Sequence, residues 1–177
     1  SGYNSSIIAG FNNTAKDANS VVIGGKNNVT GSGGGQGQVA LGGENNSITG
    51  NESTGGGYFV SVSGQFSFGF GANTGISGSY SAGFGSGTTI TNNYSFGYGQ
   101  NANTQSRFGF LVGGSGTFST SGDAQHGIAV LRVATASTSA FTLTADGGTA
   151  GSANIVNLAN NSAMRLTIDI VGRDTTN

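Results

Sequence analysis

The ionisable side chains of this chain are few, which limits the chemistry they can support. Only seven of its 177 residues are acidic, and none of the seven lies between residues 53 and 122. Enzymes that hydrolyse glycans usually place two carboxyl groups on either side of one bond. Glu44 and Glu52 could meet across a coil or between chains, but two solvated turn carboxylates are the preferred interpretation. We therefore expect no catalytic residue and no enzymatic activity.

Residue types that bind metals or cofactors are equally sparse. His126 is the only histidine, and a metal site built on it would need three copies around a threefold axis. A surface or linker histidine is the simpler interpretation. No Gly-Lys-Ser or Gly-Lys-Thr sequence marks a phosphate-binding loop, and the glycine-rich segment 33–39 lacks the aspartate of calcium-binding glycine repeats. The sequence predicts no metal and no cofactor.

The charge pattern excludes two classes of partner. The net charge is −1, and the six basic residues are scattered singly along the chain. Nucleic acids and anionic membranes are bound by clustered Lys and Arg. The chain also lacks an apolar run long enough to span a bilayer, so no membrane insertion is expected.

The overall composition indicates a fold that stacks backbone instead of packing large side chains. There are 35 Gly residues and no Pro, Cys or Trp, and only 7% of residues are charged. Globular domains usually have about 25% charged residues. The β-branched and aromatic residues nevertheless recur at fixed positions, which a disordered segment lacks. An ordered β-repeat is therefore expected.

A regular repeat dominates the middle of the chain, with equivalent positions 14 apart. Aromatic residues recur at this spacing in three registers, with Ser67, Ser81 and Ser95 and then Gly69, Gly83 and Gly97 between them. The first aromatic register holds Phe66, Tyr80, Tyr94 and Phe108; the second holds Phe68, Ala82, Phe96 and Phe110; the third holds Phe70, Phe84 and Tyr98.

Since strand side chains alternate between faces, the aromatic residues should share one face and the Ser and Gly residues the other. Ile76 and Ile90, again 14 apart, belong to short return strands. We expect the rings to be buried, inside the coil or at an interface between chains. The alternative is an exposed platform for sugar rings, with Tyr80, Tyr94 and Tyr98 as its half-exposed members.

The N-terminal third carries an aliphatic version of the repeat. Residues 6–10 and 20–24 match at a spacing of 14, and residues 38–42 match 18 later. The four extra residues fall in the glycine-rich segment 31–37, which predicts an enlarged turn. The Asn pairs 27–28 and 45–46 are predicted turns. Residues 51–65 do not align, so an interrupted or wider coil is expected there.

A coil this thin cannot cover its own apolar residues. Val21, Val22 and Ile23 place apolar side chains on both faces of one strand, so a lone chain would expose one set to water. Repeat units of this kind become stable by stacking on neighbours. Two further copies around a threefold axis are the simplest cover.

The repeat resembles that of a known family. Residues 19–24 followed by residues 27–31 are similar to the 14-residue head repeat of trimeric autotransporter adhesins, which also occurs in phage tail-fibre proteins. The resemblance covers about residues 4–113. It implies a left-handed parallel β-roll in each chain, three rolls packed as a trimer, and adhesion through the outer surface.

The sequence changes character after residue 116. We expect a repeat region over 1–116, a linker over 117–126 and a strand-rich region over 127–177, with strands over 128–133, 141–144, 154–158 and 163–171. This last region is interpreted as the beginning of a β-sandwich-like domain. Residues 122–125, 130–132 and 143–147 are similar to a segment that often follows such repeats in phage tail fibres.

The sequence thus predicts an all-β, trimeric parallel β-solenoid that attaches to a host-cell glycan or outer-membrane receptor. A virion tail is the expected location. A bacterial adhesin head at the cell surface and a glycan-cleaving tailspike are the alternatives. The predicted structural stack is Val21, Ile23, Phe66, Phe68, Phe70, Tyr80, Phe84, Tyr94, Phe96, Tyr98, Phe108 and Phe110; the candidate receptor contacts are Gly33, Gln36, Asn51 and Glu52.

Overall fold

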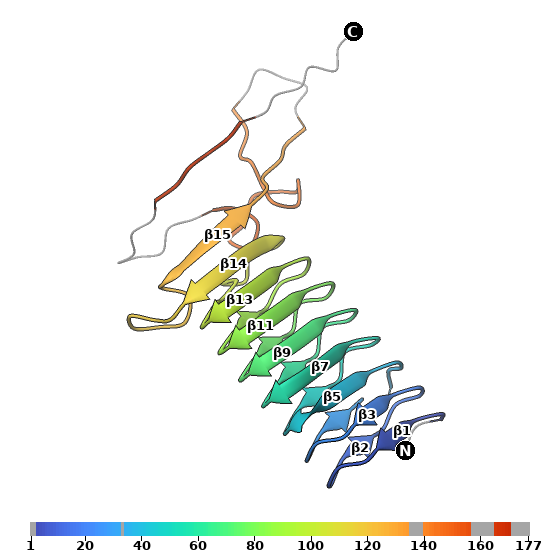
Figure 1. The fold of residues 1–177 in the computed structure, drawn as a ribbon. Coiled ribbons are helices and arrows are strands. Elements are labelled where there is room, and N and C mark those ends of the chain that lie inside the picture. Colours follow the sequence, from blue (N-terminus) through green and yellow to red (C-terminus); the bar gives the residue numbers. More distant parts are fainter. Residues whose placement is uncertain (1–2, 33, 135–139, 157–164, 171–177) are drawn as a thin grey trace.

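The chain folds as an all-β solenoid in a computed structural model, which describes residues 3–32, 34–134, 140–156 and 165–170. The described residues wind through about eight coils that stack along one axis (Figure 1). No helix is found among them, and so none that could cross a membrane. The predicted fold class, a parallel β-solenoid, is confirmed for a single chain.

Most coils contribute one long strand and one short strand to two separate sheets, in which all neighbours are parallel except β14 and β15. The nine-stranded sheet contains β1 (Ser6–Ile8), β3 (Val21–Ile23), β5 (Val39–Glu44), β7 (Thr54–Tyr58), β9 (Phe68–Ala72), β11 (Ala82–Ser86), β13 (Phe96–Gln100), β14 (Phe110–Ser115) and β15 (Gln125–Ala129). The six-stranded sheet contains β2 (Thr14–Ala15), β4 (Val29–Thr30), β6 (Ser47–Ile48), β8 (Ser61–Val62), β10 (Gly75–Ile76) and β12 (Thr89–Ile90).

The predicted 14-residue register holds from β7 to β13. Phe68 pairs with Ala82, Ala82 with Phe96, and Ile76 with Ile90. The roll also continues without interruption through residues 51–65, because β7 pairs with β9 in the same register. The expected interruption is wrong, since small residues at 55–57 keep the backbone path while removing the apolar pattern.

The first coils have a longer repeat than the sequence predicted. Ile7 pairs with Val22, whereas the predicted spacing would place it beside Val21. A one-residue slip moves every side chain to the other face of the sheet. The extra residue lies towards the end of the long stretch of each coil, where the glycine pairs 24–25 (after β3) and 42–43 (within β5) have positive φ. The change to the 14-residue register coincides with a register irregularity within β5.

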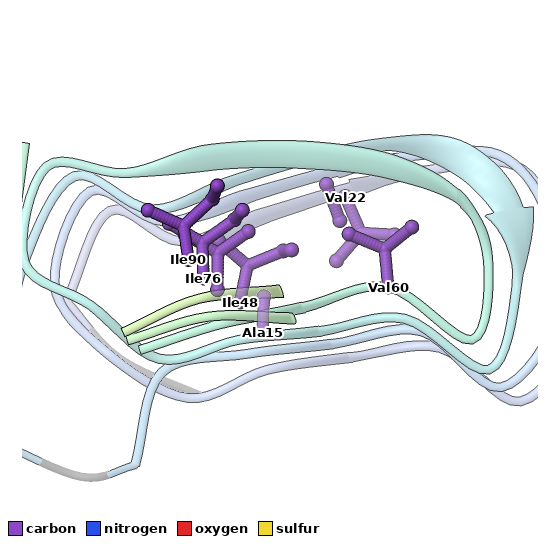
Figure 2. Packing of buried hydrophobic residues seen from close by; sticks show 8 residues of the cluster. Ala15, Val22, Ile48, Val60, Ile76 and Ile90 are labelled. Atoms are coloured by element: carbon purple, nitrogen blue, oxygen red, sulfur yellow. The ribbon is translucent and has the colours of Figure 1, made fainter. Parts of the chain in front are cut away.

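The core is a file of apolar side chains between the two sheets, with Val60 buried beside it just before β8 (Figure 2). Ile48, Ile76 and Ile90 lie behind one another inside the coil (Figure 2) and are at most 1% exposed. Opposite them the larger sheet carries glycines, and a Cβ on Gly83 would collide with the Ile76 side chain. In the second coil the sizes are reversed, because the larger sheet supplies Val22 to the same cluster. Between the facing strands there is therefore room for one large side chain per level.

Polar side chains line both curved ends of the interior as hydrogen-bonded ladders. At one end the Asn13 and Asn28 side-chain oxygens accept the N–H groups of Asn28 and Asn46, at 2.9 and 3.0 Å. At the other end the Ser67 and Ser81 hydroxyls accept the N–H groups of Ser81 and Ser95, at 3.2 and 3.1 Å. These contacts satisfy buried backbone groups that would otherwise destabilise the fold.

The C-terminal end of the solenoid is closed by a reversal of chain direction. β15 pairs antiparallel with β14, and the Gln125 side chain bonds both the N–H and the C=O of Asn103, at 2.9 and 2.8 Å. Beyond it, Arg132 and Thr144 form one antiparallel bridge. A turn at residues 145–148 is confirmed by the Asp146 carboxylate, which accepts the Gly148 N–H at 2.9 Å.

The remaining C-terminal strands are not seen in the residues described. Residues 154–156 and 165–170 are placed without strand pairing. The predicted turn at Asn160 and Asn161 and parts of both predicted strands lie outside the described residues. The β-sandwich-like domain stays a prediction.

The inner glycine column should control stability. Gly83→Ala should lower the free energy of unfolding by about 1–3 kcal/mol, because the new Cβ overpacks the core against Ile76. Gly75→Ala is the matched control, since nothing lies within 4 Å of the position that its Cβ would take. Denaturant midpoints measure both; equal midpoints for the two variants would contradict the packing argument.

The loop that precedes β15 should respond to acid through Asp123. Its carboxylate accepts N–H bonds from Thr120, Phe118 and Ser119, and these bonds hold the pKa of the carboxyl below its usual range. The stabilisation is therefore present above about pH 4 and is lost as the pH falls through the lowered pKa. Amide protection factors of Ser119 and Thr120 should stay constant down to about pH 4 and then decrease. In Asp123→Asn the protection factors of Ser119 and Thr120 should be low already at neutral pH and should not decrease further as the pH falls.

Candidate binding surfaces

The aromatic residues lie on the outside of the coil, and the Ser and Gly residues line its interior. Ser67, Ser81 and Ser95 are buried, whereas Tyr80 and Tyr94 are 53% and 57% exposed. The predicted separation into two faces is confirmed. The expectation that rings fill the coil is wrong, because the interior at these levels is already occupied by the isoleucine file.

One aromatic ladder runs along the turn that precedes the long strands. The rings of Phe66 and Tyr80 and of Tyr80 and Tyr94 are stacked, with centroids 5.1 and 5.2 Å apart. All three residues have φ between 53° and 56°, a left-handed conformation that is unfavourable for bulky side chains. Asn19 and Gly37 occupy the same turn in earlier coils, where the conformation is easily adopted.

The two phenylalanines at the end of the repeat leave this register. Phe96 pairs with Leu111, not with Phe110, and Gly109 occupies the left-handed turn position predicted for Phe108. The last coil is one residue longer, so both predictions of register are wrong. Phe108 still contacts the ladder through its ring, 5.3 Å from Tyr94.

A second feature, the outer apolar column, runs along the middle of the larger sheet. It is defined as the large side chains that successive long strands place at one outward position. Ile23, for example, is 44% exposed although it belongs to a strand in the sheet. Val21 lies on the same outward face and is half-buried. The members are Ile8, Ile23, Leu41, Phe70, Phe84 and Tyr98.

The smaller sheet presents a different outer face. Its outward positions carry, in register, Thr14, Val29, Ser47, Ser61, Gly75 and Thr89, of which only Val29 is a larger apolar residue. The others are small, and none of these side chains is charged. The two faces of the solenoid therefore differ sharply in apolar character, and only the larger sheet is suited to hydrophobic association.

A shallow groove separates the aromatic ladder from the strands of the larger sheet. It has a volume of about 380 Å³ and is centred on Ala82, the small residue between Phe68 and Phe96 in their column. The ladder forms one wall of the groove. Its lining consists of Phe66, Phe68, Tyr80, Ser81, Ala82, Tyr94, Ser95 and Phe96.

The enlarged turn predicted at residues 31–37 is built on a buried carboxylate that the sequence did not reveal. Asp17 is 3% exposed and accepts the N–H groups of Ser32 and Gly35, at 3.2 and 2.9 Å, and the Gln38 side-chain N–H at 3.2 Å. The burial of Asp17 was hard to predict from the sequence, because a single acid among turn residues is usually solvated. The carboxylate supports the turn from inside the coil.

Three of the four candidate receptor residues lie around this turn. The Asn51 side-chain oxygen accepts the Gln36 N–H at 2.7 Å, and the Glu52 N–H bonds the Gln36 carbonyl at 2.8 Å. Gln36 and Glu52 are exposed. Gly33 lies outside the described residues. The structure thus brings Gln36, Asn51 and Glu52 together on adjacent coils.

The candidate catalytic and metal-binding residues have structural neighbours. Glu44 forms an exposed ion pair with Lys26, with 3.2 Å between oxygen and nitrogen. His126 shares a hydrogen bond of 2.9 Å with the Tyr98 hydroxyl. Among the residues described, no group of three His, Cys, Asp or Glu side chains is placed to hold a metal ion. The alternative of an active site between chains stays a prediction.

Comparison with protein-family models, curated proteins and solved structures finds no match to this chain. The geometry of these surfaces therefore carries the functional argument.

Removing the Asp17 carboxylate should loosen the enlarged turn. Asp17→Ala leaves the buried Gln38 side-chain N–H without this acceptor, at roughly 1–3 kcal/mol, and removes the acceptor of the partly buried Ser32 and Gly35 N–H groups. Lys16→Ala, an exposed neighbour, should change the free energy of unfolding by less than about 0.5 kcal/mol. Denaturant midpoints compare the two variants. Equal midpoints would show that Asp17 does not support the turn.

Proposed function

We propose that the chain is a structural and host-attachment segment of an extracellular fibre, formed by three copies packed through their larger sheets. The observation that carries this proposal is the outer apolar column. It places a large apolar side chain at one outward position in most coils, and these side chains are open to water in a single chain. A covering surface of matching length is needed, and another copy supplies one.

The dimensions of the column support association between copies. The column runs over the seven long strands from β1 to β13, which at about 4.8 Å per strand gives a strip about 34 Å long. With neighbouring outward residues the strip is about 15–20 Å wide, or roughly 500–700 Å², somewhat below the roughly 800 Å² per partner of a standard interface. Burial of apolar area stabilises association by about 25 cal/mol per Å² before the entropy of association is subtracted.

A threefold arrangement suits a solenoid with one apolar face. Chains that associate around an axis parallel to their own can bury that face centrally and leave the hydroxylated sheet in water. Closed cyclic symmetry also prevents open-ended aggregation. The parallel ladders then make a stiff spacer, and three copies of each weak receptor contact raise the overall avidity.

A phage tail fibre in the virion is the preferred setting, and a bacterial adhesin head at the cell surface is the alternative. The preference rests on the resemblance of the sequence after residue 116 to segments that follow such repeats in phage fibres. The proposed partners are further copies of the chain and a host-cell glycan or outer-membrane receptor. Attachment is proposed to proceed without catalysis.

The outer apolar column should control the number of chains in the particle. Light scattering of the purified chain should give three times 17.4 kDa. Phe84→Ser should dissociate the trimer, because it places a hydroxyl at the centre of the buried strip. Phe118→Ser is the matched control, since Phe118 is 90% exposed and lies outside the column. A wild-type chain that is monomeric at high micromolar concentration would refute the proposal.

A further inference from the structure

We propose that the groove over Ala82 binds one sugar ring of a neutral glycan. This inference rests on the proposed function, because it assigns the receptor contact of the fibre to a defined surface. The groove lies on the turn side of the outer apolar column, between the aromatic ladder and strands β9, β11 and β13. It adjoins the strip proposed to be buried between copies, because the ring of Phe96, which lines the groove, lies 5.8 Å from the ring of Phe84 in the column.

The row formed by Phe68, Ala82 and Phe96, beside the outer apolar column, contains a gap of suitable size at Ala82. Phe68 and Phe96 flank Ala82 on the neighbouring strands, so the two phenylalanines are two strand spacings apart, about 9.6 Å. A ring inserted between them could contact an aromatic side chain on each side. The groove volume of about 380 Å³ lies at the lower end of the range for small-ligand sites.

The backbone around the groove has no capacity left for a peptide strand. The Ala82 N–H bonds the Ser95 carbonyl at 3.0 Å, and the Phe68 N–H bonds the Ser81 carbonyl at 3.0 Å. The Ser81 hydroxyl donates to a carbonyl inside the coil. Peptides that add to a sheet need free backbone groups at an edge. Recognition here must use ring surfaces and phenol hydroxyls, a combination well suited to carbohydrate.

Two tyrosines on the rim supply the polar contacts. Among the described residues, neither the Tyr80 nor the Tyr94 hydroxyl has a hydrogen-bond partner, whereas the Tyr98 hydroxyl is engaged by His126. Both free phenols belong to the groove lining. Each can donate to and accept from a sugar hydroxyl.

The charge of the lining selects the class of glycan. None of the residues that line the groove is ionisable near neutral pH, and none of them is Lys or Arg. An anionic sugar would lose hydration in the groove without gaining a cationic partner. A neutral hexose or N-acetylhexosamine is therefore favoured over a sialylated one.

The test uses the full chain and a panel of neutral gluco-, galacto-, manno- and N-acetylglucosamine oligosaccharides, with sialyllactose as the charged comparison. Titration calorimetry or ligand-observed NMR reports binding, and light scattering reports the mass of every variant. Ala82→Phe fills the gap with a phenylalanine, the residue that both neighbouring strands carry at this position as Phe68 and Phe96, so the fold should tolerate the change. Ser63→Phe places the same ring on the outside of the smaller sheet as the control.

We expect at least one neutral oligosaccharide to bind, with binding at least tenfold weaker in Ala82→Phe and unchanged in Ser63→Phe. Tyr94→Phe should weaken it about fivefold through one lost hydrogen bond. A wild-type trimer that binds no neutral member at millimolar concentration overturns this inference and leaves the trimer intact as a proposal. Unchanged affinity in Ala82→Phe also overturns it. A changed mass in Ala82→Phe overturns it too, by assigning the groove to an interface between copies.

Discussion

Parallel, in-register stacking of the coils is the constraint on which the rest of this structure depends. Each backbone group bonds its counterpart one coil away, so every coil must follow nearly the same path. A residue is consequently surrounded above and below by its equivalents. The narrow space between the facing strands then admits one large side chain per level, which explains why isoleucine on the smaller sheet is matched by glycine on the larger one.

The same constraint determines which surfaces can vary. Parts of the interior ends are committed to Asn and Ser ladders, because the buried N–H groups there need acceptors. Outward positions have no such requirement. The largest side chains that remain exposed therefore lie outside, where they form the outer apolar column and the aromatic ladder.

Much of the fold could be predicted from the sequence, because stacking makes each coil a repeat of its neighbour. The binding surfaces were harder to predict. The register of Phe68, Ala82 and Phe96 follows directly from spacing, but the longer first coils were missed because short aliphatic strands match almost as well at 14. Alternation separates the aromatic residues from Ser and Gly without saying which set faces inward. Here the side chain of the short return strand already fills the interior. This depends on how the short strand faces the long strand of the same coil, which the spacing of residues does not show. The burial of Asp17 likewise depends on a contact between adjacent coils.

The distribution of bulk between inside and outside supports the proposal that the aromatic coils contact other molecules. From β7 to β13 the inner position of the long strand is glycine, which loses more conformational entropy on folding than any other residue. In the same coils bulky residues occupy a left-handed turn that Asn or Gly fills in the first coils. Such strain costs about 1–3 kcal/mol per residue and persists where function requires it. Both features weaken an isolated coil, so the exposed rings are best explained by partners that cover them.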